Sequence, residues 1–187
     1  MTSVQDAIAR RLGLLEAESA IRACLSDYMD ICDRMDETTD LAPLGALFTR
    51  DAVWMGGGGR YGKDFGSHEG REAIIAWLSR FCTTPPHFAM NAHFLGSEAI
   101  RVLSDRTATG RWMMLQTPTF ANGESYLMAA RLQIGFAFEE DRWRMAHFHT
   151  TNLYARPVSS WDQNVPIPKP LTAAAPFTVA ATYKEPS

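Results

Sequence analysis

The sequence predicts an α+β fold shaped like a cone, a barrel in which three to four helices from the N-terminal half cover a bent antiparallel sheet and enclose a pocket. Apolar residues recur at helical spacing in the first part of the chain, whereas apolar and polar residues alternate from Pro85 onward, as they do in strands. Helices followed by a run of strands are typical of an α+β layer fold. A bent sheet covered by helices leaves a natural ligand cavity at the mouth of the cone.

The composition indicates one globular domain followed by a tail. The chain has 187 residues, of which 46% are hydrophobic, and this is enough for a sizeable core. We expect residues 1–155 to form the domain and residues 156–187, which are rich in proline, to form an extended tail. We also expect a homo-oligomer, either a trimer or a dimer, since one face of the sheet would otherwise stay exposed.

Charge and hydropathy exclude several classes of partner. A formal net charge of −3 and a pI near 5.9 leave no basic surface for nucleic acid or for an anionic membrane. The apolar stretches are interrupted well short of the roughly 20 residues that a membrane helix needs. The N-terminus lacks the pattern of a secretory signal, and the three cysteines lack metal-type spacing. We therefore expect a cytoplasmic protein.

The helices are predicted in the first half of the chain. Residues 4–13 have the pattern of a short helix, and a longer helix is predicted from about residue 16 to residue 36. On this longer helix Tyr28 lies at the centre of the apolar face, and Asp33 lies toward its flank. A second short helix is predicted within residues 40–48.

A small two-stranded unit is predicted after these helices. A strand at residues 52–55 leads into the run Gly56 to Gly59, which we expect to be a flexible turn into a second strand at about residues 60–65. The glycine run lacks the spacing of a phosphate-binding loop. Ser67 is then a plausible N-cap for a third helix.

The rest of the chain is predicted as strands. His87, Ala89, Asn91 and His93 are expected to share one face of an alternating segment. A strand at residues 107–117 follows, and residues 126–138 and 142–153 make a long hairpin. On the last strand we expect Met145, His147 and His149 to point to the same side.

Four segments resemble the nuclear-transport-factor-2-like superfamily and, within it, the SnoaL-like (polyketide cyclase-like) group. The resemblance covers about residues 12 to 155 and implies that residues 1–155 form a SnoaL-like α+β barrel domain. It says little about function, because the superfamily includes many chemistries and some non-enzymes. The segments are residues 47–54, 69–74, 87–88 and 143–145.

A narrower resemblance is to scytalone dehydratase and bile acid 7α-dehydratase. Those enzymes carry a tyrosine on the first long helix, here Tyr28, and the bile acid enzyme has an aspartate five residues later, here Asp33. Their catalytic histidine begins the strand after the third helix, which the resemblance matches to His87. Two positions differ from those enzymes. Gln116 is closest to the position where the bile acid enzyme has a pocket aspartate. Trp54 or Met55 lies near the position of a second tyrosine, which this chain lacks.

These three residue types point to proton-transfer chemistry beside a carbonyl group. His87 would be the general base, since an imidazole titrates near neutral pH, and Asp33 would fix its tautomer. Tyr28 would donate a hydrogen bond to the carbonyl oxygen. We therefore expect a dehydratase that needs no cofactor and acts on a hydrophobic, ring-containing hydroxy-carbonyl compound such as a polyketide or a steroid-like molecule.

Other polar and aromatic residues are candidates for binding the substrate. The pair His147 and His149 is similar to the His-x-His pair of some metal sites, but no glutamate at a ligand spacing completes the set, so we expect no metal. The same two histidines are then possible substrate contacts. The candidate substrate-binding residues are Trp54, Trp112, Gln116, His147 and His149.

Two alternatives to a dehydratase remain open. The small subunits of ring-hydroxylating dioxygenases share this fold and act as scaffolds without catalytic chemistry. A ketosteroid-isomerase-like isomerase or a cyclase would instead use a lone carboxylate as its base. The set Tyr28, Asp33 and His87 favours an enzyme over a scaffold, because a scaffold has no need of an oriented base.

Overall fold

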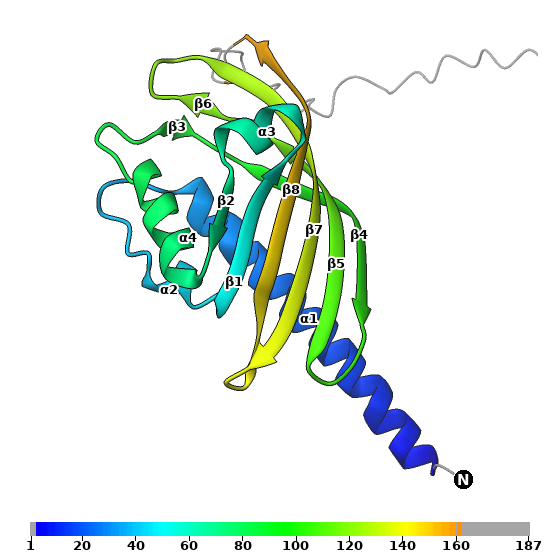
Figure 1. The fold of residues 1–187 in the computed structure, drawn as a ribbon. Helices are drawn as coiled ribbons and strands as arrows, with labels where there is room; N and C mark the ends of the chain where they lie inside the picture. The colour runs from blue at the N-terminus through cyan, green and yellow to red at the C-terminus, as the bar shows by residue number, and fades with distance from the viewer. Residues whose placement is uncertain (1–2, 160, 162–187) are drawn as a thin grey trace, which may run out of the picture.

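The computed structural model describes residues 3–159 and residue 161 (Figure 1). The helices of this part of the chain precede most of its strands, as the sequence predicts. They are α1 (Val4–Asp33), α2 (Ala42–Gly45), α3 (Gly58–Asp64) and α4 (Arg71–Leu78), and a 3₁₀ turn (Ser79–Phe81) follows α4.

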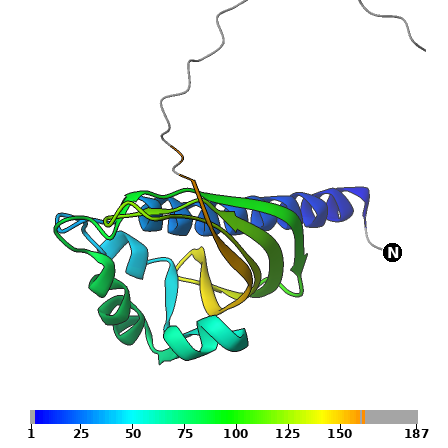
Figure 2. The same ribbon diagram turned by 90° about the horizontal axis from the view of Figure 1, so that it is seen from above.

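The strands form one curved sheet in the order β2-β1-β8-β7-β5-β4, while β3 pairs with β6 and β6 pairs with β7. Neighbouring strands are antiparallel except β1 and β8, which run parallel. The path ends at the edge strands β2 and β4, so the sheet curves without closing; α1 runs along one side of the molecule, and α3 and α4 lie toward the other side (Figure 2). The predicted α+β class is confirmed. The strands are β1 (Phe48–Gly57), β2 (Ser67–Glu69), β3 (Phe88–Met90), β4 (His93–Val102), β5 (Thr107–Gln116), β6 (Thr119–Phe120), β7 (Ser125–Glu139) and β8 (Arg142–Val158).

Helix α1 is continuous over 30 residues. Ser3 caps it, because the Ser3 hydroxyl accepts from the Asp6 N–H while the Asp6 carboxylate accepts from the Ser3 N–H. The predicted division into one helix at residues 4–13 and another from residue 16 is wrong. Gly13 is the weakest helix former at the junction, and glycine costs only about 1 kcal/mol relative to alanine within a helix.

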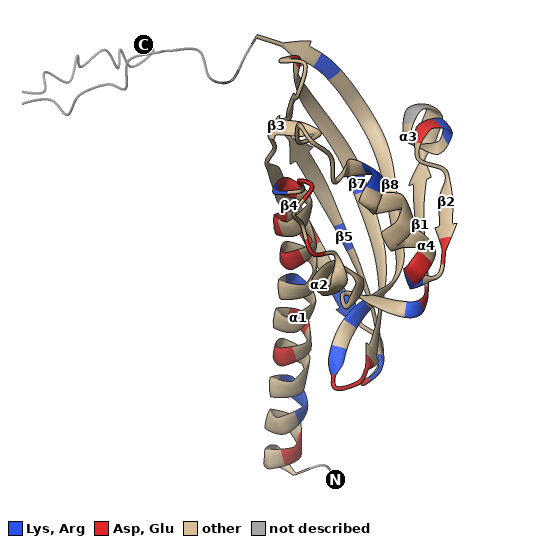
Figure 3. Ribbon diagram, turned by 90° about the vertical axis from the view of Figure 1, so that its left-hand side faces the viewer, with Lys and Arg blue, Asp and Glu red and all other residues tan. Residues whose placement is uncertain are grey.

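The second half of α1 packs on the sheet, whereas its first turns extend past the end of the sheet (Figure 3). The packed half contacts β4 and β8. Its last two turns therefore bring Tyr28 and Asp33 against the sheet, and this positions the site. The buried residues of α1 are Ala17, Ile21, Cys24, Leu25, Tyr28 and Met29.

The glycine run after β1 leads into a helix, so the predicted strand at residues 60–65 is wrong. Helix α3 folds back onto β1 so closely that a Cβ atom on Gly56 would lie 2.4 Å from the Tyr61 carbonyl oxygen. A Cβ atom on Gly57 would lie 2.2 Å from Nε2 of His149. These glycines therefore allow close approach of two elements rather than a flexible turn.

The third predicted helix begins later than its predicted N-cap. Ser67 lies in β2, where residues 67–69 pair with residues 53–55 of β1. Helix α4 starts at Arg71, after Gly70, whose φ of 89° lies in the region that favours glycine. The pairing with β1 therefore decides the structure of this segment, and the local capping signal at Ser67 does not.

The last strand contains a β-bulge that changes which side chains face the core. Gly135 of β7 pairs with His147 and Phe136 pairs with Met145, so Ala146 is the extra residue on β8. Met145 is fully buried, while His147 is exposed. The prediction that Met145 and His147 share one face is wrong, because the bulge reverses the alternation between them.

The core lies between the helices and the concave face of the sheet. Strand β8 continues to Val158, past the predicted domain end at residue 155, and most of the tail expected at residues 156–187 lies outside the described residues. Within the described part, no helix is both long and apolar enough to cross a membrane. The largest fully buried side chains include Ile21, Leu25, Leu44, Phe48, Ile74, Leu132 and Met145.

Candidate active site

An aspartate–histidine pair joins the end of α1 to the start of β4. Oδ1 of Asp33 lies 2.6 Å from Nδ1 of His93, and Oδ2 of Asp33 accepts the backbone N–H of His93 at 3.0 Å. Because an ionised carboxylate can only accept, this contact favours a proton on Nδ1 of His93. The side chains of His93 and Asp33 are 10% and 20% exposed, so the pair is largely shielded from bulk water.

Two amide side chains extend this pair into a network. Nδ2 of Asn91 donates to Oδ1 of Asp33 at 2.9 Å, and Oδ1 of Asn91 accepts from Nε2 of Gln116 at 2.9 Å. Gln116 is also the register partner of His93 across β4 and β5. Asp33 thus accepts three hydrogen bonds, from Asn91 and from the backbone and ring of His93, and these fix its orientation.

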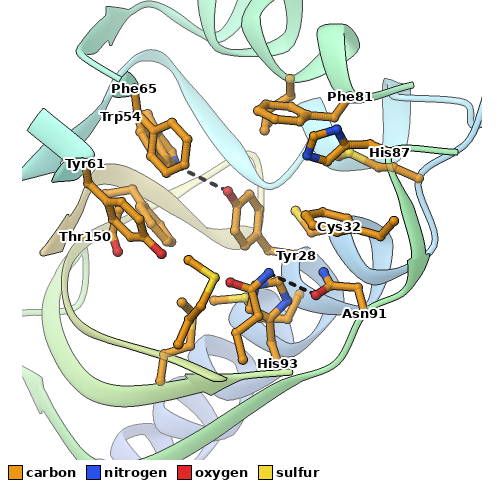
Figure 4. A pocket seen from close by; sticks show the side chains of 18 of the residues that line it. Tyr28, Cys32, Trp54, Tyr61, Phe65, Phe81, His87, Asn91, His93 and Thr150 are labelled. Carbon is orange, nitrogen blue, oxygen red and sulfur yellow. Dashed lines mark hydrogen bonds between the residues drawn. The ribbon is translucent and has the colours of Figure 1, made fainter. Parts of the chain in front are cut away.

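The histidine of this pair borders a cavity of about 360 Å³. His93 lines the cavity, and Nε2 has no hydrogen-bond partner among the described residues. An imidazole held in this way can accept a proton at Nε2 from a molecule in the cavity. Most of the wall is apolar or aromatic, including Met29, Cys32, Met35, Trp54, Tyr61, Phe65, Leu78, Phe81, Phe88, Met114, Phe120, Met128, Leu132 and Phe148 (Figure 4).

Tyr28 places a hydroxyl group in the same cavity. Its oxygen accepts from Nε1 of Trp54 at 3.2 Å, and its ring packs against Phe48 and Phe148. Burial raises the pKa of Tyr28 well above its ordinary value and raises the pKa of the Cys32 thiol to about 12, because a charge would lose its hydration there. Tyr28 is therefore neutral and keeps a proton that it can donate.

The comparison with protein families identifies this architecture. A model described as a SnoaL-like domain matches residues 14–149. The chain belongs to the SnoaL-like domain family. A search of curated protein sequences finds no match.

Solved structures share the SnoaL-like fold of this chain at low sequence identity. A hexachlorocyclohexane dehydrochlorinase (LinA) of type 2 is 17% identical with a TM-score of 0.66, over 87% of this chain and 99% of that chain. An NTF2-like protein with a cystatin-like fold from Novosphingobium aromaticivorans is 23% identical with a TM-score of 0.63, over 82% and 92%. A protein of Novosphingobium aromaticivorans DSM 12444, provisionally assigned as a scytalone dehydratase, is 15% identical with a TM-score of 0.64, over 81% and 97%.

The histidine that joins Asp33 in this SnoaL-like chain is not the predicted one. His87 lines the cavity, but Asp33 pairs with His93, so the predicted Asp33–His87 pair is wrong. The segment is not one alternating strand: β3 ends at Met90, and β4 begins at His93. Strand β3 pairs with β6 whereas β4 pairs with β5, so the two histidines have different surroundings in the site.

The predicted substrate-binding residues divide into two groups. Trp54 and Gln116 line the cavity, whereas Trp112 is absent from its described lining, and Nε1 of Trp112 donates to Glu98 at 3.1 Å. His147 and His149 are also absent from the lining. They lie on the opposite face of β8 from the buried residues Phe148 and Thr150, because the bulge sets their direction.

Several lining residues were missed by the sequence analysis. Thr150 follows Phe148 at strand spacing, so the alternation on β8 is the signal that could have found it. Tyr61 comes from α3, which the sequence analysis interpreted as a strand. Among the described residues, no group of three or more His, Cys, Asp or Glu side chains is arranged to hold a metal ion.

Proposed function

We propose that this protein is a lyase that needs no cofactor and removes a proton with the Asp33–His93 pair. The reaction we favour is a dehydration of a hydrophobic ring compound that carries a carbonyl group and a hydroxyl group. The observation that carries the proposal is the geometry of His93, whose Nδ1 is held by a carboxylate while the residue lines an apolar cavity.

The base would act through Nε2. When the imidazole takes a proton from the substrate carbon, Asp33 stabilises the imidazolium, as the carboxylate of a catalytic triad does. Proton transfer by a positioned side chain contributes on the order of 10²–10⁴-fold in rate. The hydrogen bonds from Asn91 and from the His93 backbone hold the carboxylate in place, so it cannot turn away from the ring.

The negative charge left by proton removal would develop on the carbonyl oxygen. Tyr28 is the donor that we assign to this oxygen: the Tyr28 oxygen accepts the bond from Trp54, and the hydroxyl proton, which otherwise meets the Cys32 sulfur, would turn to the substrate. A neutral phenol in an apolar wall stabilises such a charge strongly, since little water competes with it. Dehydration then follows when the hydroxyl group leaves the neighbouring carbon and takes up a proton.

The size and chemistry of the cavity support a small aromatic or alicyclic substrate. A volume of about 360 Å³ is at the low end of the roughly 300–1,000 Å³ typical of small-molecule sites, which favours about two or three rings over a full steroid. The names of two structural neighbours, a dehydrochlorinase and a provisionally assigned dehydratase, denote elimination reactions. They give the proposed reaction class a precedent on this fold.

The direct test replaces His93 and compares the activity of this variant with that of a variant in which a histidine outside the cavity is replaced. His93→Gln should lower turnover of 3-hydroxy-1-tetralone, a two-ring β-hydroxy ketone that dehydrates to 1-naphthol, by at least about 100-fold. His147→Gln is the matched control, because His147 is exposed on the other face of the sheet. Equal activity of the two variants would contradict the proposal.

We also propose that the chain forms a homo-oligomer through the outer face of its sheet. Phe94 and Leu115, which pair in register on β4 and β5, are 56% and 36% exposed, and Leu153 and Tyr154 of β8 are 44% and 46% exposed. Exposed apolar side chains gathered on neighbouring strands are typical of an interface. Light scattering that gives the mass of a monomer at micromolar concentration would contradict this assembly.

A further inference from the structure

The outer face of the sheet carries a row of three arginines. Arg101 of β4, Arg111 of β5 and Arg131 of β7 are each exposed, while the residues on either side of them in their strands are less exposed. Arg101 pairs with Thr109, which stands two residues before Arg111, and Arg131 stands two residues before Gln133, the register partner of Arg111. Diagonal neighbours of this kind are roughly 7–8 Å apart, within reach of long side chains. The three arginines therefore form one diagonal row across three neighbouring strands.

The positive charge of this row is not compensated by carboxylates of the sheet. None of its arginines is in an ion pair with a described residue, whereas Arg22 and Arg144 are. The chain as a whole has a formal net charge of −3, so the row is a local excess of positive charge. Like charges on neighbouring strands repel each other, and a bound anion would remove this repulsion. The strand segments around the row contain no aspartate or glutamate, and these segments are residues 99–103, 107–115, 129–137 and 145–151.

A hollow of about 450 Å³ lies at one end of the row. Gly135, which is opposite His147 in the register of β7 and β8, has no side chain to fill it. His149 stands beside His147 on the same face, with ring centroids 6.4 Å apart. The side chains that line the hollow and can donate a hydrogen bond are Arg101, Thr109, Arg111, Gln133 and His147.

We infer that this hollow binds a phosphate group carried by a small soluble molecule, on the face of the sheet opposite the candidate active site. A phosphate group has several oxygens and more than one charge, so it can accept from two guanidinium groups and from neutral donors at once. An extended polyanion fits the surroundings less well. His147 pairs with Val53 and Val53 pairs with Glu69, an exposed acid in the same row of the sheet, which would repel a longer anion.

Calorimetry with glycerol 3-phosphate at low ionic strength tests the site directly. Arg111→Gln, which changes the central arginine of the row, should weaken binding about 10-fold, the loss expected for one charged hydrogen bond. Arg11→Gln is the matched control, because Arg11 is exposed on the first half of α1 and is in no ion pair with a described residue. The control should bind as the unaltered protein does. Equal affinity of the two variants, or no binding of glycerol 3-phosphate at millimolar concentration by the unaltered protein, would overturn the inference.

Two further readouts locate the site and control for folding. In NMR spectra glycerol 3-phosphate should shift the ring signals of His147 and His149 and leave those of His93, in the cavity, unchanged; the opposite pattern would overturn the inference. The ligand should also raise the melting temperature of the unaltered protein more than that of Arg111→Gln, since binding to the folded state alone stabilises it. The same rise in both proteins would be the general effect of a phosphate salt and would contradict the site.

A last comparison distinguishes a small molecule from a membrane, because the headgroup of an anionic lipid carries the same phosphate chemistry. Vesicles of phosphatidylglycerol are sedimented with the full chain at about 0.15 M salt, where interactions with distant charges are screened. We expect the protein to stay in solution. Sedimentation that is lost in Arg111→Gln would assign the row to a lipid surface and overturn the inference. Because none of these measurements uses turnover, their outcome is independent of the proposed lyase activity.

Discussion

Replacing Asp33 by asparagine should damage both the activity and the stability of the protein. The carboxylate accepts three N–H donors: the backbone N–H of His93, Nδ1 of His93 and Nδ2 of Asn91. An asparagine has one oxygen and an NH₂ group, so at least one of these donors would meet another donor. Leaving such a group unpaired costs about 1–3 kcal/mol in the free energy of unfolding. The asparagine NH₂ would also favour the tautomer in which Nε2 carries the proton, which removes the base and should lower kcat about 10²–10⁴-fold.

The assay pairs urea unfolding with turnover of 3-hydroxy-1-tetralone. Asp30→Asn is the matched control, because Asp30 lies on the same helix, is exposed and pairs only with the neighbouring Arg34 among the described residues. An exposed pair of this kind contributes little to stability, so the control should behave like the unaltered protein. If Asp33→Asn retained both its turnover and its free energy of unfolding, the reasoning from the three hydrogen bonds would be refuted.

Three further predictions follow from the geometry of the cavity wall. Tyr28→Phe should reduce kcat about 10- to 100-fold, because the donor to the carbonyl oxygen is lost. It should also reduce the free energy of unfolding by about 1 kcal/mol, because Trp54 Nε1 loses its acceptor. An unchanged kcat would remove Tyr28 from the mechanism. Gly56→Ala should destabilise the protein by about 1–3 kcal/mol, since the added Cβ meets the Tyr61 backbone, and a melting temperature equal to that of the unaltered protein would contradict the placement of α3. Burial lowers the pKa of His87, so the folded state binds this proton less readily than the unfolded state, and stability should fall as the pH drops below about 6.5. His87→Phe should flatten this part of the curve of stability against pH. Identical curves for the two proteins would refute the burial of this ring.

Much of the fold could be predicted because its long elements have strong periodicity. The apolar spacing of α1 placed Tyr28 on the buried face and Asp33 beside it, and the alternation in β5, β7 and β8 gave strands within a few residues of the observed ones. These elements bury one continuous face each, so local sequence and tertiary packing favour the same structure. The end of α1 was therefore correctly placed as part of the cavity.

The errors occur where backbone pairing overrides the local pattern. The bulge at Ala146 reverses the direction of the side chains that follow Met145, and no local signal in the sequence marks it. Likewise, His93 rather than His87 lies next to Asp33, and His93 is held in β4 by its pairing with Gln116 of β5. Residues far apart in sequence determine both features, so one sequence read alone cannot supply them.

The protonation state of His93 provides the most direct test of the proposed chemistry. Nitrogen-15 NMR of the five histidines, with His93 assigned through His93→Gln, reports which ring nitrogen carries the proton. We predict that the neutral tautomer of His93 carries its proton on Nδ1, and that Asp33→Asn shifts this proton to Nε2. A proton on Nε2 in the unaltered protein, or a tautomer that does not respond to Asp33→Asn, would contradict the assignment of this pair as the base.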